Sequence, residues 1–396
     1  MSADTSSSLN RIDALQGATK PFGSGVGAMR SVFVWFCILL LAGCSSTDRF
    51  AAPIVAFAPT TEQPPRETVF FGTTRLKRPD GTYGFGRSGA LELGRVTVAI
   101  PPLREPGSVS NGGAQPDPRR DFMLTEKTVY SAESSFQTDL RQRLRDAPAD
   151  QREVTVFVHG FNTSYTDAMF RMAQIRHDLD IPGQAVVYAW PSRAHPLGYE
   201  YDDESALFAR DGLEQLLETI TRSGASRIVV VAHSMGSYLA METLRQLEIE
   251  RPGWTGRHVS GVILISPDIG IDLFRSQLAR MPVVPDPFVI FVSRRDIFLR
   301  LSATLTGEPE RLGNIEDGSS IADLPVSVVD VSAFSDGNGN HFVPAASPTL
   351  IALFRQADRL DQTFLRREGG STYNVLHSQR VIVRRAGQVV VEQFDR

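Results

Sequence analysis

The chain has 396 residues, of which 42% are hydrophobic and 22% are charged, and its formal net charge at pH 7 is −4. These proportions are typical of a globular protein with a sizeable core, and they exclude a disordered or fibrous chain. The slightly acidic balance gives no sign of a nucleic-acid partner. Because the only two cysteines are Cys37 and Cys44, a disulfide framework and a cysteine-based zinc site are also excluded.

An apolar run of ten residues, 32–41, follows Met29 near the start of the chain. The run is too short for an ordinary transmembrane helix but has the length of a signal-peptide core. Leu41-Ala42-Gly43-Cys44 closes it and resembles the lipobox of bacterial lipoproteins, in which the thiol is acylated and the chain is cut before the cysteine. We therefore expect a signal peptide over 1–43, with Met29 as the true initiator. The alternative is a general signal peptide with an incidental cysteine.

The segment that follows, 44–68, carries Pro, Thr and Ala without clear periodicity and is predicted to be a lipid-anchored tether. Ser45, in place of an aspartate after the cysteine, resembles the signal for outer-membrane sorting in bacteria with two membranes. The sequence thus predicts a protein of the bacterial cell envelope, held on the outer membrane through Cys44 and facing the periplasm.

The next stretch, 69–102, is mixed and ends in an apolar run at 96–100 that predicts a strand. Within it, Gly84-x-Gly86-x-x-Gly89 matches the dinucleotide-binding fingerprint, but no apolar strand precedes it and no helical pattern follows. We therefore expect no dinucleotide site there. Residues 101–120 contain five prolines and three glycines and are predicted to form a surface loop.

Six apolar, mostly β-branched runs follow, and they begin 26 to 43 residues apart, which is the length of a strand plus a crossover helix. Most of them lack strict alternation, as expected of parallel strands that are covered on both faces. Helical spacing of apolar residues appears between them, at 166–180, 203–223 and 235–247. The pattern predicts an open α/β sheet, mostly parallel, with helices on both faces. The six runs are 154–158, 185–189, 228–231, 262–265, 288–292 and 326–331.

The C-terminal segment, 361–396, is predicted to be an extension of the main domain at 69–360. Two short apolar runs, 381–383 and 389–391, flank Ala386-Gly387 and predict a β-hairpin. No function follows from it.

A polar cluster ends each predicted strand. Because the carboxyl ends of parallel strands meet at one edge of a sheet, where ligands bind, we expect these side chains to gather there. Together they supply a serine, two candidate carboxylates and several histidines. The clusters are His159–Asn162, Trp190–Ser192, His233–Gly236, Ser266–Asp268, Ser293–Asp296 and, after the last strand, Gly339–His341.

The segment Ala232-His233-Ser234-Met235-Gly236 nearly matches the Gly-x-Ser-x-Gly nucleophile elbow. The elbow is a tight strand-to-helix turn, and it needs small residues two positions either side of the serine. Ala232 keeps its position small, and the segment stands between a predicted strand and a predicted helix. We therefore expect Ser234 to be a nucleophile, the alternative being a helix N-cap serine.

A serine hydroxyl is a weak nucleophile until a base takes its proton and a third group orients that base. The chain order in the elbow fold is serine, acid, histidine, which predicts Asp296 as the acid and His341 as the base. Asp268, at the preceding strand end, is the alternative acid; its other expected role is to cap a helix at 271–281. The oxyanion hole is predicted from the backbone N–H groups of Met235 and Phe161.

His159 is expected to be structural. The run 336–340 begins like a calcium loop, but His341 stands where glycine is required, so we expect no metal site.

These motifs resemble a bacterial subgroup of the α/β-hydrolase superfamily that has no settled substrate, over roughly 69–360. The resemblance implies the α/β-hydrolase fold and a triad of Ser234, Asp296 and His341. It predicts hydrolysis of an ester, thioester or amide through an acyl-enzyme, without a cofactor, on a small-molecule or lipid-like ester substrate. The alternative function is a non-catalytic envelope tether or binding module. The segments that carry the resemblance are Phe157–Asn162, Trp190–Ser192, Ala232–Gly236, Ser266–Asp268 and, upstream, Gly72–Arg75.

Overall fold

A computed structural model describes residues 54–55, 63–113, 115–308, 310–315, 318–334 and 341–352, and the backbone of 372–376, 379–384 and 388–393. The predicted signal peptide, Cys44 and most of the tether at 44–68 lie outside the described residues, as does the run 336–340. None of the helices in the described ranges is long and apolar enough to span a membrane.

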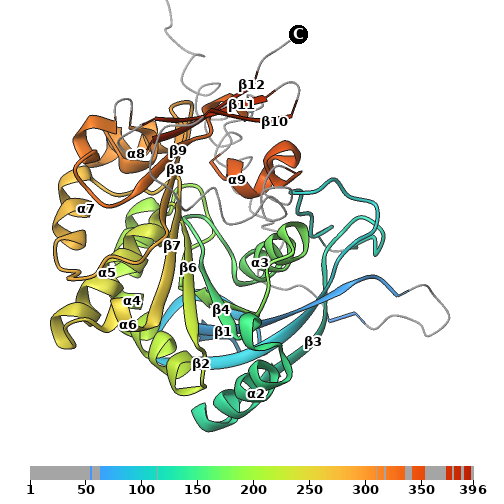
Figure 1. Ribbon diagram of the computed structural model, residues 1–396. Helices are drawn as coiled ribbons and strands as arrows, with labels where there is room; N and C mark the ends of the chain where they lie inside the picture. Colours follow the sequence, from blue (N-terminus) through green and yellow to red (C-terminus); the bar gives the residue numbers. More distant parts are fainter. Residues whose placement is uncertain are drawn as a thin grey trace, which may run out of the picture. The chain divides into compact units, whose positions relative to one another are not determined.

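The strands of the described residues form one twelve-stranded sheet, in the order β10-β11-β12-β9-β8-β7-β6-β4-β5-β1-β2-β3 (Figure 1). The strands are β1 (Arg66–Lys77), β2 (Tyr83–Ala99), β3 (Met123–Val129), β4 (Glu153–Val158), β5 (Gln184–Ala189), β6 (Arg227–His233), β7 (Val259–Ile265), β8 (Phe288–Val292), β9 (Ser327–Asp330), β10 (Thr372–Leu376), β11 (Gln379–Arg384) and β12 (Gln388–Gln393).

The centre of the sheet is parallel, from β5 through β4, β6, β7 and β8 to β9. β1 joins β5 in parallel, and β2 and β3 continue the sheet antiparallel. The six predicted runs coincide with β4 to β9, so the predicted mostly parallel α/β sheet is confirmed. The predicted hairpin is formed by β11 and β12, and β12 pairs in parallel with β9.

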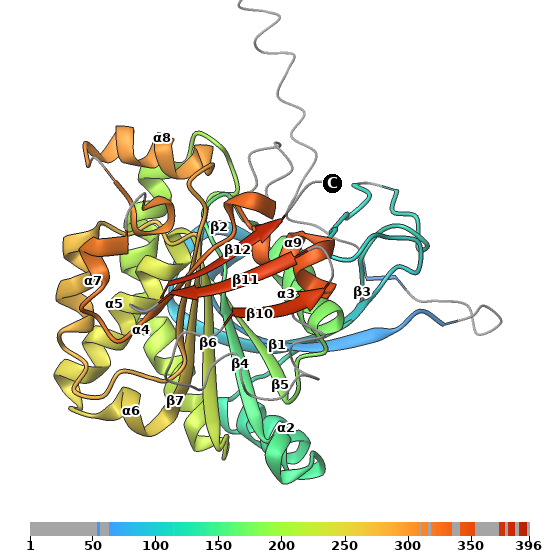
Figure 2. The same cartoon turned by 45° about the horizontal axis from the view of Figure 1, so that its top comes forward.

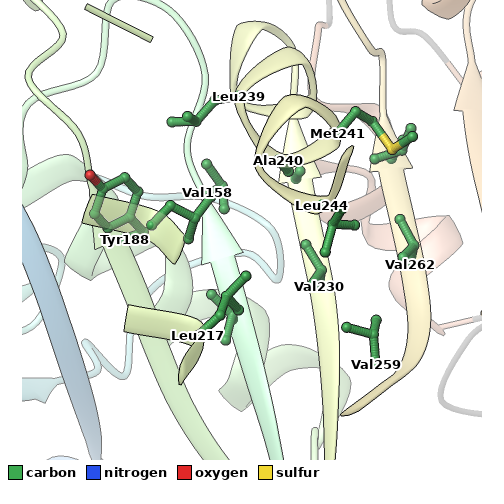
Figure 3. Close-up of a cluster of buried hydrophobic side chains, with 14 of the residues drawn as sticks. Val158, Tyr188, Leu217, Val230, Leu239, Ala240, Met241, Leu244, Val259 and Val262 are labelled. Atoms are coloured by element: carbon green, nitrogen blue, oxygen red, sulfur yellow. The ribbon is translucent and has the colours of Figure 1, made fainter. Parts of the chain in front are cut away.

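Helices cover both faces of the sheet (Figures 1 and 2). One buried apolar cluster lies under α3 and α9, and the other under α4, α5 and α7. Figure 3 shows part of the second cluster, where Val158, Val230 and Val262 from three strands approach Leu239 and Leu244 of α5. The helices are α2 (Glu133–Asp146), α3 (Tyr165–Leu179), α4 (Tyr199–Arg222), α5 (Met235–Glu250), α6 (Trp254–His258), α7 (Ile271–Leu278), α8 (Ile297–Thr306) and α9 (Val343–Ala346).

β1, β3, the first part of β2 and four of the helices were not predicted from the sequence. β1 begins at Arg66, inside the segment predicted as tether, and its buried residues include the polar run 73–75. β2 contains four glycines, and the false dinucleotide fingerprint, 84–89, lies within it. Because polar residues and glycines interrupt β1 and the first part of β2, these stretches lack the apolar pattern on which strand prediction depends. The end of β2 is the strand predicted at 96–100. β3, α2, α6, α8 and α9 were not predicted either.

Helix α5 approaches β4 so closely that only glycine fits at its second position. A Cβ added to Gly236 would lie 2.2 Å from the carbonyl oxygen of His159 and 2.6 Å from that of Val158. This close approach sets the head of α5 against the end of β4.

We predict that Gly236→Ala lowers the free energy of unfolding by about 2 kcal/mol, because the added methyl group must push α5 away from β4. Urea denaturation measures the change. The matched control is Gly89→Ala, since an added Cβ there meets nothing within 4 Å. Equal stability of the two variants would contradict the close approach.

Candidate active site

Ser234 is the single residue between β6 and α5. Its backbone has φ 52° and ψ −126°, a conformation that is strained for a residue with a side chain. Its N–H donates to the carbonyl oxygen of Ile265 (3.0 Å), which anchors the turn to β7. Although Ser234 occupies the N-cap position of α5, its side chain makes no capping hydrogen bond. The turn is therefore the strand-to-helix elbow that the sequence predicts.

His341 and Asp296 are in direct contact. Nδ1 of His341 lies 2.5 Å from Oδ2 of the fully buried Asp296. Oδ1 of the same carboxylate accepts hydrogen bonds from the N–H groups of Phe298 (3.0 Å) and Leu299 (3.1 Å), so Asp296 is also the N-cap of α8. A proton on Nδ1 of His341, shared with this carboxylate, leaves Nε2 as the basic nitrogen.

Ser234 and His341 line the same pocket, which has a volume of about 60 Å³. Asp268 also lines it, and Asp296 lies behind His341. Most of the remaining wall is apolar. The other lining residues are Phe161, Pro196, Tyr199, Phe298, Leu299, Leu301, Ser302 and Leu305.

Asp268 has a different set of partners. Its Oδ1 accepts hydrogen bonds from Nε of Arg311 (2.7 Å) and from the hydroxyl of Ser302 (2.6 Å). Its Oδ2 accepts one from the hydroxyl of Tyr199 (3.0 Å). The contact with His341 is thus made by Asp296 and not by the alternative acid. The expected capping role of Asp268 is wrong, because α7 begins after Gly270 without any side-chain cap.

The loop after β4 brings Phe161 to the elbow. A Cβ on Gly160 would lie 2.6 Å from Nδ1 of His233 and 2.9 Å from Cβ of Ser234, so only glycine permits this approach. Met235 begins α5 directly after Ser234, where the N–H groups of the first turn have no partner within the helix. One predicted oxyanion donor, Met235, therefore lies at the start of α5, and the other, Phe161, lies in the loop after β4 that packs against the elbow.

A buried arginine, to which the sequence analysis gave no role, holds the loops that follow β4 and β5. Arg75, on β1, donates hydrogen bonds to the carbonyl oxygens of Thr163 (2.7 Å) and Ser192 (3.0 Å). Burial lowers the pKa of its guanidinium to about 10, and the nearby Asp202 carboxylate opposes that shift. Asp202 in turn accepts from the N–H of Asn162 (3.2 Å) and the hydroxyl of Ser192 (2.6 Å). The sequence feature that could have pointed to Arg75 is the motif Gly72–Arg75. The motif does not show which loops the arginine contacts.

His159 has structural partners, as expected. Its ring stacks on Trp190 with centroids 4.9 Å apart, and Nε1 of Trp190 donates to its carbonyl oxygen (2.7 Å). Its own Nδ1 lies 2.9 Å from the carbonyl oxygen of Gly160. Burial lowers the pKa of His159 to about 3, so the imidazole is neutral in the native protein at ordinary pH.

His233, the residue before Ser234, supports His341 rather than the hydroxyl. Its Nε2–H donates to the carbonyl oxygen of His341 (3.0 Å), and the two rings lie with centroids 4.7 Å apart. Phe342 packs edge-on against His233 at 4.6 Å. Burial holds the pKa of His233 well below its ordinary value. The elbow and the segment that carries His341 are therefore linked directly.

Among the residues that the structure describes, no three His, Cys, Asp or Glu side chains lie close enough together to hold a metal ion.

We predict that the buried, neutral His159 makes the protein less stable in acid. Its pKa is about 3 when folded and 6.5 when exposed, so below pH 6.5 the unfolded chain binds a proton that the native state refuses. Stability is complete above pH 6.5 and falls by about 1.4 kcal/mol per pH unit as pH drops toward 3. Urea titrations between pH 7.5 and 4 measure this slope, and His159→Gln is expected to make it shallower. An unchanged slope in that variant would contradict neutral burial.

Comparison with known proteins shows the family to which the chain belongs. Residues 132–357 match the family described as alpha/beta hydrolase of unknown function (DUF900). The chain belongs to that family, and it is an α/β hydrolase. No match to the chain was found among curated proteins.

Solved structures that are similar at low sequence identity include three hydrolases. Lipase B of Aspergillus fumigatus is 16% identical, with a TM-score of 0.34; the match covers 56% of this chain and 60% of the lipase. A putative hydrolase from Agrobacterium vitis S4 is 14% identical, with a TM-score of 0.29, over 75% of this chain and 98% of that one. Esterase 2 of Thermogutta terrifontis is 17% identical, with a TM-score of 0.31, over 56% of this chain and 88% of the esterase.

Proposed function

We propose that this α/β hydrolase is a serine hydrolase that cleaves an ester through an acyl-enzyme intermediate. The observation that carries the proposal is the contact between His341 and the buried Asp296 at the wall of a pocket that also contains Ser234. A base oriented by a buried carboxylate, beside a serine on a strained elbow, is the arrangement that makes a hydroxyl nucleophilic.

In the first half of the proposed reaction, Oγ of Ser234 attacks the ester carbonyl while Nε2 of His341 takes the hydroxyl proton. The carbonyl oxygen becomes an oxyanion and accepts hydrogen bonds from the backbone N–H groups of Met235 and Phe161. When the tetrahedral intermediate collapses, the bond to the leaving alcohol breaks and His341 returns the proton to that alcohol. The acyl group remains on Ser234.

In the second half, water attacks the acyl-enzyme, with His341 again as the base. The acid product leaves and the Ser234 hydroxyl is restored. Asp296 orients the ring of His341 and stabilises its charged form, and no step requires a cofactor. The mostly apolar pocket wall suits an apolar acyl group. Thioesters and amides are the other substrates of the same chemistry.

We predict that a fluorophosphonate probe labels the protein at Ser234 and that Ser234→Ala abolishes the labelling. Asp296→Asn is expected to slow ester hydrolysis by about 10³- to 10⁴-fold, because the amide cannot stabilise the charged ring of His341. The matched variant Asp268→Asn is expected to lose about tenfold or less, since the carboxylate of Asp268 contacts Arg311 instead. Labelling of Ser234→Ala, or a larger loss for Asp268→Asn than for Asp296→Asn, would count against the proposal.

We further propose that the protein is a lipoprotein of the bacterial outer membrane, acylated at Cys44 and facing the periplasm. Support comes from the apolar run 32–41 and the sequence Leu41-Ala42-Gly43-Cys44 that ends it. The membrane would then be a permanent partner of the hydrolase domain through a tether at 44–68.

Expressed in a bacterium with two membranes, the mature protein is expected to begin at Cys44, to carry fatty acyl groups there and to fractionate with the outer membrane. Mass spectrometry of the N-terminal peptide and membrane fractionation measure this. Cys44→Ser should abolish acylation, whereas Cys37→Ser, in the segment that is removed, should not. An unmodified Cys44 in the wild-type protein would refute the anchor.

A further inference from the structure

Helix α8 has large apolar side chains on its outer face. Ile297, Phe298, Leu301 and Leu305 are between 49% and 60% exposed, and three of them recur at intervals of four residues along one stripe. Leu197, at the tip of the loop that precedes α4, is 90% exposed. We call these five side chains the α8 surface.

The inner face of α8 is firmly docked, so the outward position of these side chains does not come from loose packing. Leu299 and Ala303 are buried, and the hydroxyl of Ser302 donates to Asp268 (2.6 Å). Oγ of Ser302 also lies 2.7 Å from the hydroxyl of Tyr199. Because polar bonds and apolar contacts hold the inner face, α8 has to present its remaining apolar side chains outward. A helix that is apolar on both faces is unusual on a protein surface in water.

The α8 surface is continuous with the pocket of the candidate active site. Phe298, Leu301 and Leu305 line that pocket, and so does Pro196, the neighbour of Leu197. The acyl chain of a substrate can therefore reach from the α8 surface toward Ser234 while it stays in contact with apolar side chains.

Basic residues precede the same helix and lie within it, while Glu308, which follows it, pairs with Arg311 (2.7 Å). Between Arg294 and Gly307 there are three arginines and one carboxylate, and that carboxylate, Asp296, is fully buried against His341. Arg294 also pairs with Asp330 (2.8 Å), while Arg295 and Arg300 are exposed. Exposed apolar side chains beside guanidinium groups are typical of helices that lie in the interface of an anionic bilayer.

We propose that the α8 surface docks on an anionic phospholipid bilayer and that the ester substrate is presented from that bilayer, its acyl chain entering the pocket along α8. This rests on the function proposed for Ser234. A bilayer fits better than a protein partner because a protein seated on α8 would close the pocket mouth, whereas lipid supplies the chain that enters it. The arginines match the lipid phosphates in charge.

The docking can be tested without activity. The chain carrying Cys37→Ser and Cys44→Ser receives one new cysteine, Leu197→Cys, labelled with an environment-sensitive dye. The control site is Val283→Cys, which is 58% exposed and lies beside α6, at the opposite end of the strands from α8 (Figures 1 and 2). The dye reports whether its own position contacts lipid. This readout does not depend on which part of the protein attaches it to the vesicle.

With vesicles of phosphatidylcholine and phosphatidylglycerol, the dye at position 197 is expected to shift to the blue and to be quenched by acyl-chain quenchers. The dye at 283 should not respond. With phosphatidylcholine alone the response at 197 should weaken, because the arginines lose their anionic partners. Equal responses at 197 and 283, or no response at 197, would overturn the proposal. A protein partner would then be the alternative occupant of the α8 surface.

Kinetics separate this inference from the proposed function. The double variant Leu197→Ser/Ile297→Ser changes two side chains that do not line the pocket. It is expected to hydrolyse a long-chain ester in anionic vesicles about tenfold more slowly, and a short soluble ester within about twofold of the wild-type rate.

The matched control is Ile249→Ser/Val283→Ser, at positions away from α8 that are 51% and 58% exposed, and it should keep both rates. If the wild-type protein hydrolyses neither ester, the proposed function fails. If it hydrolyses both and the Leu197→Ser/Ile297→Ser variant keeps the vesicle rate, the docking surface alone fails.

Discussion

The turn at Ser234 compresses the end of β6, the start of α5 and the loop after β4 into a very small space. The serine stands alone between strand and helix with φ 52° and ψ −126°, which costs about 1–3 kcal/mol of backbone strain. Gly236 and Gly160 make room for the carbonyl of His159 and for the ring of His233, respectively. The proposed nucleophile, the proposed oxyanion donors and the support of His341 all depend on this packing.

Two buried charged networks hold the loops on either side of that turn. Arg75 and Asp202 fix the loops after β4 and β5, and Asp268 with Arg311 fixes the inner wall of the pocket. Buried ion pairs add little net stability, because desolvation offsets their attraction. Their effect is to specify one loop geometry, since removing either partner leaves a buried charge without compensation.

Two carboxylates at neighbouring strand ends differ in role because their neighbours differ. Asp296 faces His341 and the first turn of α8, whereas Asp268 faces Arg311, Ser302 and Tyr199. The same network that occupies Asp268 also fastens α8, and so it connects the candidate active site with the proposed lipid-facing surface.

The sequence predicted the centre of the sheet well, because β4 to β9 are apolar runs covered on both faces. It did not predict β1 or the first part of β2, where polar residues and glycines interrupt the apolar pattern. The choice between Asp268 and Asp296 stayed open because both follow a strand, and the deciding partner, Arg311, is distant in the sequence. The exposed apolar face of α8 was missed because exposure depends on which side of the helix docks.

The most direct test of the proposed mechanism is a crystal structure of the protein after reaction with a phosphonate ester. We expect a covalent bond from phosphorus to Oγ of Ser234, with the phosphonyl oxygen within hydrogen-bond distance of the N–H groups of Met235 and Phe161. Phosphorus on another residue, or a phosphonyl oxygen turned away from both N–H groups, would contradict it.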